Sequence, residues 1–336
     1  MVTNRQQRGD FRQLVHTPAE LATYYTRWAT SIIENPGIPL GVPALDEKVI
    51  PLRPGDLVGI IARPGMGKSS LMAYLAMQEA RRIQKRQTVG KEAVVYVTWE
   101  SSAEEIENFW MAQGQYSASD VAWGRVPIDI ITRNAIKRPQ LPIWTIGHAI
   151  AKAGQPMPRM NLDAVLGAIE SMQADFGAKP TLILFDYIQL IPVDGIYDRQ
   201  RRVTEVPPMV KELALRVGAP AVCGVQAARE VDTLKYKIPE MQHAQWASSI
   251  EQAADKLFSM WRPYRSEGPE GEPVRLTKNS CAYRITPELT IMRMLKQRGD
   301  DGRFTWAMYF APQYLKLAEM ETEQGHSGGE QWQNRI

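Results

Sequence analysis

The chain has few of the features that mark secreted, membrane or metal-scaffolded proteins. Its 336 residues include only two cysteines, Cys223 and Cys281, which lie far apart and lack metal-ligand spacing. No stretch reaches the roughly eighteen apolar residues of a membrane span, and the N-terminus lacks the apolar core of a signal peptide. We therefore predict two reduced thiols, no membrane association and a cytoplasmic location.

Extreme composition is also absent. Apolar residues make up 44% and charged residues 23% of the chain, which is ordinary for a folded globular protein. The net charge of +3 neither requires nor excludes a nucleic-acid partner, because binding depends on a local basic patch. The length and the lack of internal repeats favour one large α/β domain over two small ones.

The segment Asp56–Ser70 carries the most specific signal, because an apolar run breaks into a glycine-rich turn ending in Gly-Lys-Ser. Such a loop opens a helix whose free N–H groups surround a phosphate, while Lys68 reaches the β/γ oxygens and Ser69 can ligate Mg²⁺. Ala62 stands where the motif has its first glycine. We predict ATP and Mg²⁺ as cofactors. The predicted nucleotide contacts are Arg63, Pro64, Gly65, Met66, Gly67, Lys68, Ser69 and Ser70.

Apolar β-rich runs alternate with helical periodicity along the rest of the chain. This alternation predicts an α/β fold with a mostly parallel sheet and helices on both faces. The predicted strands are Leu57–Ile61, Ala93–Trp99, Thr181–Phe185 and Pro220–Val225, and the helices are Leu71–Gln84, Leu162–Phe176, Val203–Val217 and Ser249–Asp255. Leu289–Lys296 and Phe304–Phe310 flank a Gly-Asp-Asp-Gly turn and predict a C-terminal antiparallel hairpin. Residues 112–160 give no clear pattern.

Three predicted strands end at polar residues, Glu100, Asp186 and Gln226. Ligands of open α/β sheets bind at the carboxyl edge of the strands, so we expect these side chains to meet there. Asp186 suits a carboxylate near Mg²⁺, Glu100 a base that orients water, and Gln226 a sensor of the γ-phosphate. The alternatives are a strand-end acid without a role, an acid at a helix N-terminus, and an edge amide bonded to backbone.

Lys296 and Arg298 lie two residues apart, so a strand would point both side chains to the same face. Two cations directed one way suggest a phosphate contact, supplied to a neighbouring subunit if the hairpin lies at a boundary. The alternative is a solvated basic edge that discourages aggregation.

The N-terminal part predicts one isolated helix. Residues 1–16 are polar and aperiodic, and we expect them to be flexible. Thr17-Pro18-Ala19-Glu20 has the pattern of a capping box, and the helical segment 17–36 carries an aromatic stripe that must pack in its own domain or on a neighbouring subunit. The polar tail, residues 319–336, is predicted to be disordered.

Taken in order, several stretches resemble the C-terminal motor domain of DnaB-type replicative helicases, a RecA-like P-loop NTPase. They are IARPGMGKSS, VVYVTWESSAEEI, TLILFDYIQLIPVDG, GAPAVCGVQAARE, SSIEQAADKLF and MLKQRGDDG. The resemblance spans roughly residues 19–318, with the motor domain at 37–318. The family also has an alanine in place of the first motif glycine, as this sequence has at Ala62.

The resemblance implies a role for each matched residue. Lys68 and Ser69 would bind nucleotide and Mg²⁺, and Asp186 would be the second-motif acid that also holds the metal. Glu100 would be the catalytic base and Gln226 the residue that couples nucleotide to DNA. Lys296 and Arg298 fall on the family's trans-acting pair.

The resemblance also implies partners. The family forms hexameric rings that move 5′ to 3′ along single-stranded DNA, with a helicase loader or primase as possible partners. The helix at 17–34 resembles the linker helix that docks on the adjacent subunit. Only sixteen residues precede it, so we expect this sequence to lack the family's N-terminal collar domain.

The DNA-facing segment departs from the family, because Gln245 stands where an arginine is expected. Trp246 suits stacking on a base, and two lysines in the preceding loop suit phosphate contacts. Their alternatives are a packed aromatic and a solvated loop. The predicted DNA contacts are Lys235, Lys237, Gln245, Trp246 and Ser248.

The leading hypothesis is an ATP-dependent DNA helicase or translocase. The alternatives are a RecA-type DNA-dependent ATPase that remodels DNA without unwinding it, and a scaffold that assembles on ATP binding. Unwinding separates the first two, and stimulation of ATP turnover by DNA separates both from the scaffold.

Overall fold

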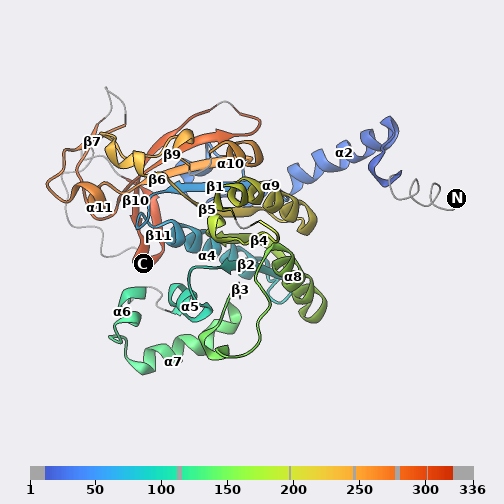
Figure 1. The fold of residues 1–336 in the computed structure, drawn as a ribbon, viewed down its shortest axis with the longest axis horizontal. Coiled ribbons are helices and arrows are strands. Elements are labelled where there is room, and N and C mark those ends of the chain that lie inside the picture. Colours follow the sequence, from blue (N-terminus) through green and yellow to red (C-terminus); the bar gives the residue numbers. More distant parts are fainter. Residues whose placement is uncertain are drawn as a thin grey trace. The chain divides into compact units, whose positions relative to one another are not determined.

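The computed structural model describes residues 12–111, 116–196, 198–244, 247–276, 281–300 and 302–320. The chain forms two compact units, residues 1–38 and 39–336. The first contains η1 (Arg12–Leu14) and α2 (Pro18–Glu34), shown in Figure 1. The predicted capping box is confirmed, because the Thr17 side chain accepts from the Glu20 amide and the Glu20 carboxylate accepts from the Thr17 amide at 2.6 Å.

The second unit is built on a sheet whose described strands follow the order β11-β10-β9-β6-β1-β5-β4-β2-β3 (Figure 1). The strands are β1 (Leu57–Ala62), β2 (Glu92–Thr98), β3 (Ile143–Ile146), β4 (Lys179–Asp186), β5 (Ala221–Gln226), β6 (Lys256–Trp261), β9 (Leu289–Gln297), β10 (Thr305–Ala311) and β11 (Lys316–Glu319). The strands β3, β2, β4, β5, β1 and β6 are parallel, whereas β9, β10 and β11 add antiparallel pairs. A separate short pair joins β7 (Val274–Arg275) to β8 (Ala282–Tyr283).

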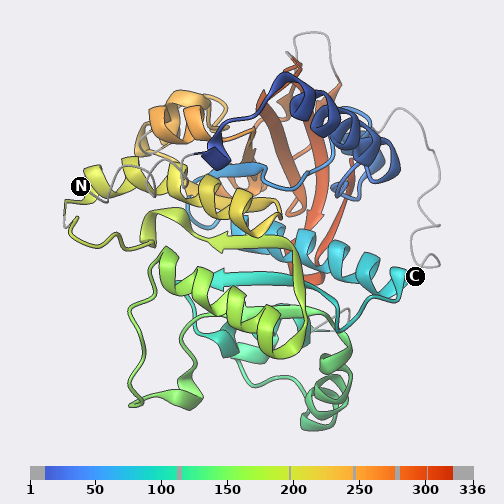
Figure 2. The ribbon, with the colours of Figure 1, turned by 90° about the vertical axis from the view of Figure 1, so that its right-hand side faces the viewer.

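Helices connect the parallel strands, as the sequence predicts (Figure 2). The helices of this unit are α3 (Pro43–Asp46), α4 (Lys68–Arg86), α5 (Ala103–Met111), α6 (Ala118–Ala122), α7 (Ile128–Lys137), α8 (Leu162–Phe176), α9 (Arg199–Val217), α10 (Ala247–Ala253) and α11 (Pro263–Glu267). Of these, α3 precedes β1 and α11 follows β6, and the others lie between parallel strands. The 3-10 turns are η2 (Arg138–Gln140), η3 (Ile150–Lys152), η4 (Ile188–Leu190), η5 (Arg229–Thr233), η6 (Met241–His243) and η7 (Pro312–Tyr314).

The central strands are buried on both faces, and alternate residues assign each face to different helices. Leu57 and Ile61 of β1 pack in the core that includes residues of α8 and α9. Val58 and Ile60, on the opposite face, meet Leu71 and Leu75 of α4. Burial of all six residues of β1 explains why this strand reads as a continuous apolar run.

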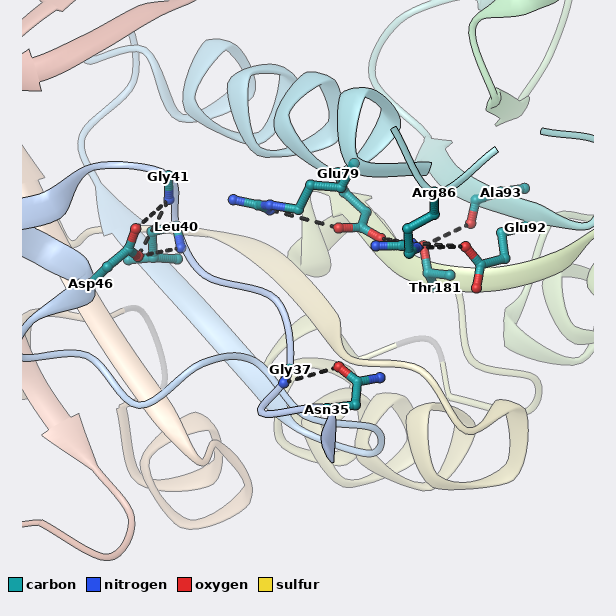
Figure 3. Close-up of polar contacts among 11 residues, drawn as sticks. Asn35, Gly37, Leu40, Gly41, Asp46, Glu79, Arg86, Glu92, Ala93 and Thr181 are labelled. Carbon is teal, nitrogen blue, oxygen red and sulfur yellow. Dashed lines mark hydrogen bonds and ion pairs between the residues drawn. The ribbon is translucent and has the colours of Figure 1, made fainter. Parts of the chain in front are cut away.

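An ion cluster anchors the far end of α4 to the sheet (Figure 3). The Arg86 guanidinium lies 2.8 Å from Glu79 on the same helix and 2.8 Å from Glu92 at the start of β2. Arg82 lies 3.6 Å from Glu79, whose side chain is only 1% exposed. The cluster therefore compensates a buried carboxylate and fixes the helix that follows the phosphate loop.

The predicted elements need several corrections. The helix predicted at Ser249–Asp255 is Ala247–Ala253, and the one at Val203–Val217 begins at Arg199, where the Asp198 side chain caps it. The antiparallel hairpin is confirmed as β9 and β10. Sequence reasoning missed β6, which lies between β1 and β9, and also β3 and β11. Of the segments predicted to be flexible or disordered, 1–16 and 319–336, residues 1–11 and 321–336 lie outside the described residues. Within the described parts of these segments, Arg12–Leu14 form η1 and Glu319 ends β11.

Candidate nucleotide site and its surroundings

The phosphate loop has the backbone that its glycines permit. Gly67 precedes α4 with φ of 92°, a conformation that disfavours side chains. A Cβ at Gly67 would also lie 3.3 Å from the Phe310 ring. The positive φ therefore favours glycine at this position, and the first helical residue after it is Lys68.

The Lys68 ammonium lies over the loop and donates to the Ala62 carbonyl at 3.3 Å. Desolvation by burial lowers the pKa of Lys68, and the nearby charges of Asp186 and Glu100 oppose that change. The ammonium thus sits at the loop with weak backbone partners, which leaves it able to bind an added phosphate.

A cavity of about 420 Å³ opens at the carboxyl edge of the sheet. It brings Glu100, Asp186 and Gln226 together with the loop, as expected from the ends of β2, β4 and β5. The full lining is Pro64, Gly65, Gly67, Lys68, Ser69, Ser70, Glu100, Asp186, Tyr187, Gln226, Arg262, Arg265 and Pro312. Two predicted nucleotide contacts, Arg63 and Met66, do not line it: the Met66 side chain is buried and that of Arg63 pairs with Asp232.

The two carboxylates differ in environment. Asp186 is buried, and its Oδ2 accepts a hydrogen bond from the Tyr96 hydroxyl at 2.8 Å. Desolvation raises the pKa of Asp186, while hydrogen bonding by Ser69 and Tyr96 opposes the rise. Glu100 is exposed at the cavity mouth, and partial desolvation together with the charge of Asp186 raises its pKa, against the effect of Lys68.

The donors present fit Mg²⁺. Within the described residues, Oδ1 of Asp186 is buried without a well-formed hydrogen bond, and Ser69 lies beside this carboxylate. A buried, unsatisfied carboxylate oxygen next to a hydroxyl suits a hard cation or one of its waters. No group of three or more His, Cys, Asp or Glu that could hold a metal occurs in the described ranges, so nucleotide oxygens and water would have to complete the shell.

Sequence reasoning missed two cations at this cavity, Arg262 and Arg265. Arg262 is 6% exposed, donates to the Pro287 carbonyl at 2.6 Å and lies 6.0 Å from the centre of the Phe310 ring. Desolvation lowers its pKa, and the charge of Arg265 adds to that effect. The sequence gives only a weak signal for Arg262, because the run before it, Leu257–Trp261, is short and interrupted by Ser259, although the structure shows it to be most of strand β6.

Lys296 and Arg298 lie at the other end of the sheet. Lys296 is opposite Leu257, near the start of β6, and its ammonium donates to the Ala254 carbonyl at 2.7 Å. The Arg298 guanidinium lies 3.2 Å from Asp255, whose backbone amide bonds Leu57 at the start of β1. Lys296 and Arg298 thus contact neighbouring residues, Ala254 and Asp255, at the amino edge of the parallel strands. This edge is about 20 Å of strand away from the phosphate loop of the same chain.

The predicted DNA contacts are only partly described. Lys237 pairs with Glu267 at 2.5 Å and is 21% exposed, whereas Lys235 is 74% exposed and lies 3.5 Å from Glu272. Ser248 lines a separate hollow that includes Glu240, Glu251 and Arg303, and Gln245 and Trp246 lie outside the described residues. The charge of Lys237 is thus engaged by a carboxylate, while Lys235 is open to solvent.

Comparison with known families agrees with this geometry. The model of the DnaB-like helicase C-terminal domain matches residues 37–318. The chain belongs to this family. None of the described helices is long and apolar enough to cross a membrane.

Curated relatives are replicative helicases of bacteria. The chain is 26% identical over 239 residues to the replicative DNA helicase DnaC of Bacillus subtilis (strain 168), covering 67% of this chain and 47% of that protein. It is 25% identical over 232 residues to the replicative DNA helicase DnaB of Geobacillus stearothermophilus, covering 68% and 48%. The chain thus spans about half the length of the curated relatives it matches.

Solved structures share the fold. One solved ATPase domain superposes with a TM-score of 0.71 at 16% identity, covering 91% of this chain and 100% of that one. A DnaB-like replicative helicase, studied with its interactions with primase, gives a TM-score of 0.68 at 16% identity, covering 91% and 67%. These matches confirm the RecA-like α/β fold predicted from the sequence.

Proposed function

We propose that the chain is the motor of an ATP-dependent DNA helicase, which hydrolyses ATP at boundaries between copies and moves 5′ to 3′ along single-stranded DNA. The observation that carries this proposal is the carboxyl-edge cavity, where the phosphate loop meets Glu100, Asp186 and Gln226. A phosphate cradle beside a carboxylate base and a metal-side carboxylate is the arrangement that nucleotide hydrolysis requires.

Each residue has a distinct task in this proposal. The loop amides and Lys68 hold the β- and γ-phosphates, and Glu100 orients the attacking water. Ser69 and Asp186 would hold Mg²⁺, which when bound neutralises charge on the phosphate oxygens. Gln226 lies beside Ala62 in the paired ends of β5 and β1, next to the loop, where it can respond to the γ-phosphate.

The position of Lys296 and Arg298 supports shared sites between copies. Both cations lie at the amino edge of the sheet, so a single chain cannot bring them to its own cavity without refolding. A second copy can receive them, and cations added to a phosphoryl-transfer site stabilise transition-state charge. We therefore propose a homo-oligomer, a hexameric ring by family resemblance.

DNA binding belongs to the segment after Gln226. That segment begins beside the phosphate loop, where the Ala227 amide donates to the Ala62 carbonyl at 3.0 Å, and it leads to Lys235, Lys237 and Ser248. It provides a short covalent route from nucleotide to the proposed DNA contacts, which include Gln245 and Trp246. A loader or primase is a further partner class to test, since one solved relative was studied with primase.

The test compares the wild-type chain with Lys68→Ala. We expect Mg²⁺-dependent ATP hydrolysis, stimulation by poly-dT, and strand release from a forked duplex with a 5′ tail, all lost in Lys68→Ala. Stimulation without strand release would favour the remodelling ATPase. Turnover that ignores DNA would favour the scaffold, and unimpaired hydrolysis in Lys68→Ala would refute the assignment of the site.

A further inference from the structure

Tyr96 is an unusual residue for the middle of a buried strand. It is 0% exposed, and within β2 it is flanked by valines that are equally buried. A phenol in an apolar interior needs a partner for its hydroxyl, because an unpaired buried polar group is costly. Its partner here is the Asp186 carboxylate, whose Oδ2 accepts the hydrogen bond at 2.8 Å.

The hydroxyl is held on a rigid support. The backbone of Tyr96 pairs with Thr145 of β3 on one side and Leu184 of β4 on the other. Its ring meets the Trp110 ring edge-on, with 6.1 Å between centroids and 73° between planes. Strand and ring contacts together leave the phenol little freedom to follow a moving carboxylate.

The two oxygens of Asp186 are thereby made unequal. Oδ2 is engaged by Tyr96, while Oδ1 is buried without a well-formed partner in the described part of the chain. Gly224 faces Oδ1, since a Cβ at this glycine would lie 3.8 Å from it. Because the carboxylate torsion of Asp is a broad two-fold rotor, a hydrogen bond to one oxygen is an effective way to fix the other.

We propose that Tyr96 is a positioning residue for the metal-side carboxylate: it holds Oδ2 of Asp186 so that Oδ1 is presented beside Ser69 to the hydrated Mg²⁺ ion of the nucleotide. The inference rests on the proposed function, because it takes Asp186 as the metal-side acid. Partners that orient a metal-binding carboxylate affect metal affinity without touching the ion.

The test is Tyr96→Phe, which removes one oxygen and keeps the ring. We expect Mn²⁺ binding to the ADP complex, followed by electron paramagnetic resonance, to weaken about tenfold, with a matching rise in the Mg²⁺ concentration for half-maximal ATPase. Binding of a fluorescent ADP analogue in EDTA should stay unchanged. The amount of analogue bound gives the number of folded sites, so that Mn²⁺ affinity is measured per site.

Tyr74→Phe is the matched control. Tyr74 is 2% exposed on α4, and its hydroxyl donates to the Gly41 carbonyl at 3.2 Å, so the control loses a comparable buried hydrogen bond. It should lower the unfolding midpoint without changing Mn²⁺ affinity. Equal Mn²⁺ affinity in Tyr96→Phe and wild type would overturn the inference. If Asp186→Asn also leaves Mn²⁺ affinity unchanged, the error lies instead in the proposed site.

Discussion

The Arg63 guanidinium binds both carboxylate oxygens of Asp232, with distances of 3.0 Å from Nε to Oδ1 and 2.8 Å from Nη2 to Oδ2. Its remaining nitrogen, Nη1, donates to the Ala227 carbonyl at 3.0 Å. One side chain of the phosphate loop therefore spans to two points of the segment that follows Gln226. This contact joins the phosphate loop to the segment that leads to the proposed DNA contacts, in addition to the proposed coupling through Gln226.

We predict that Asp232→Asn weakens coupling between DNA and ATP turnover. The variant loses the charge that pairs with Arg63 in a fork-shaped contact but keeps its shape. Stimulation of phosphate release by poly-dT should fall severalfold, while turnover without DNA changes less than twofold. Glu230→Gln is the control, because Glu230 is exposed two residues away and makes no ion pair among the described residues. Full stimulation in Asp232→Asn would exclude this link.

We also predict trans-complementation between Lys68→Ala and Arg298→Ala. Each variant alone should lose at least about 100-fold in turnover, since one lacks the phosphate lysine and the other a proposed cationic finger. Mixed assemblies contain boundaries where an intact loop faces an intact Arg298. Phosphate release should therefore recover on mixing, and recovery should depend on the mixing ratio.

The complementation experiment needs two controls. Arg298 also lies 3.2 Å from the buried Asp255, so Arg298→Ala needs a thermal unfolding curve beside its kinetics. Arg303→Ala, on the same hairpin and exposed, should retain activity. If mixing restores nothing while both proteins are folded and assembled, the cation acts within its own chain or not at all.

The raised pKa of Glu100 predicts a shifted acid limb in the pH profile. Desolvation, reinforced by Asp186, favours the protonated acid, so the base form is lost at a pH above the ordinary glutamate value of 4.5. We expect kcat/KM to fall as pH decreases through this raised value, because this ratio reports the free enzyme. Circular dichroism over the same range excludes unfolding, and an acid limb at or below 4.5 would contradict the assignment.

Disrupting the ion cluster of α4 should lower the free energy of unfolding without loss of ATP hydrolysis. Arg86→Ala removes the 2.8 Å partner of Glu79, a side chain that is 1% exposed. Because Arg86 itself is 43% exposed, we expect a loss of about 1 to 2 kcal/mol in the free energy of unfolding, below the cost of breaking a fully buried pair. Urea denaturation measures it. Arg81→Ala, exposed on the same helix, should change stability by less than about 0.5 kcal/mol.

Much of the carboxyl-edge site could be predicted from the sequence. Strands β2, β4 and β5 each contain a buried run of mostly apolar residues. Parallel strands place their ends at one edge, so Glu100, Asp186 and Gln226 meet by topology. The phosphate loop could be recognised in the sequence because its residues Gly67 and Lys68 come after a predicted strand and directly before a predicted helix. These inferences need only local pattern and the direction of the strands.

Other features depend on pairings that one sequence does not reveal. Strand β6 follows α10 after only two residues and begins with Lys256, so its six residues lacked the turn and the clean alternation that mark a strand. Missing β6 hid Arg262, which reaches the cavity only because β6 pairs with β1. In the sequence Tyr96 is indistinguishable from the apolar residues around it. Its hydroxyl gains a partner, Asp186, only when β2 pairs with β4.

The placement of Lys68 and Arg298 at opposite ends of one sheet determines how many complete nucleotide sites an assembly contains. If every working site takes one half from each of two copies, an open arc of n chains contains n − 1 sites and leaves an idle half at both tips. Closing the arc adds one more site without adding a chain. Turnover per protomer would then climb as assemblies lengthen and reach its ceiling when the last gap shuts, so dilution would reduce specific activity before any chain unfolds.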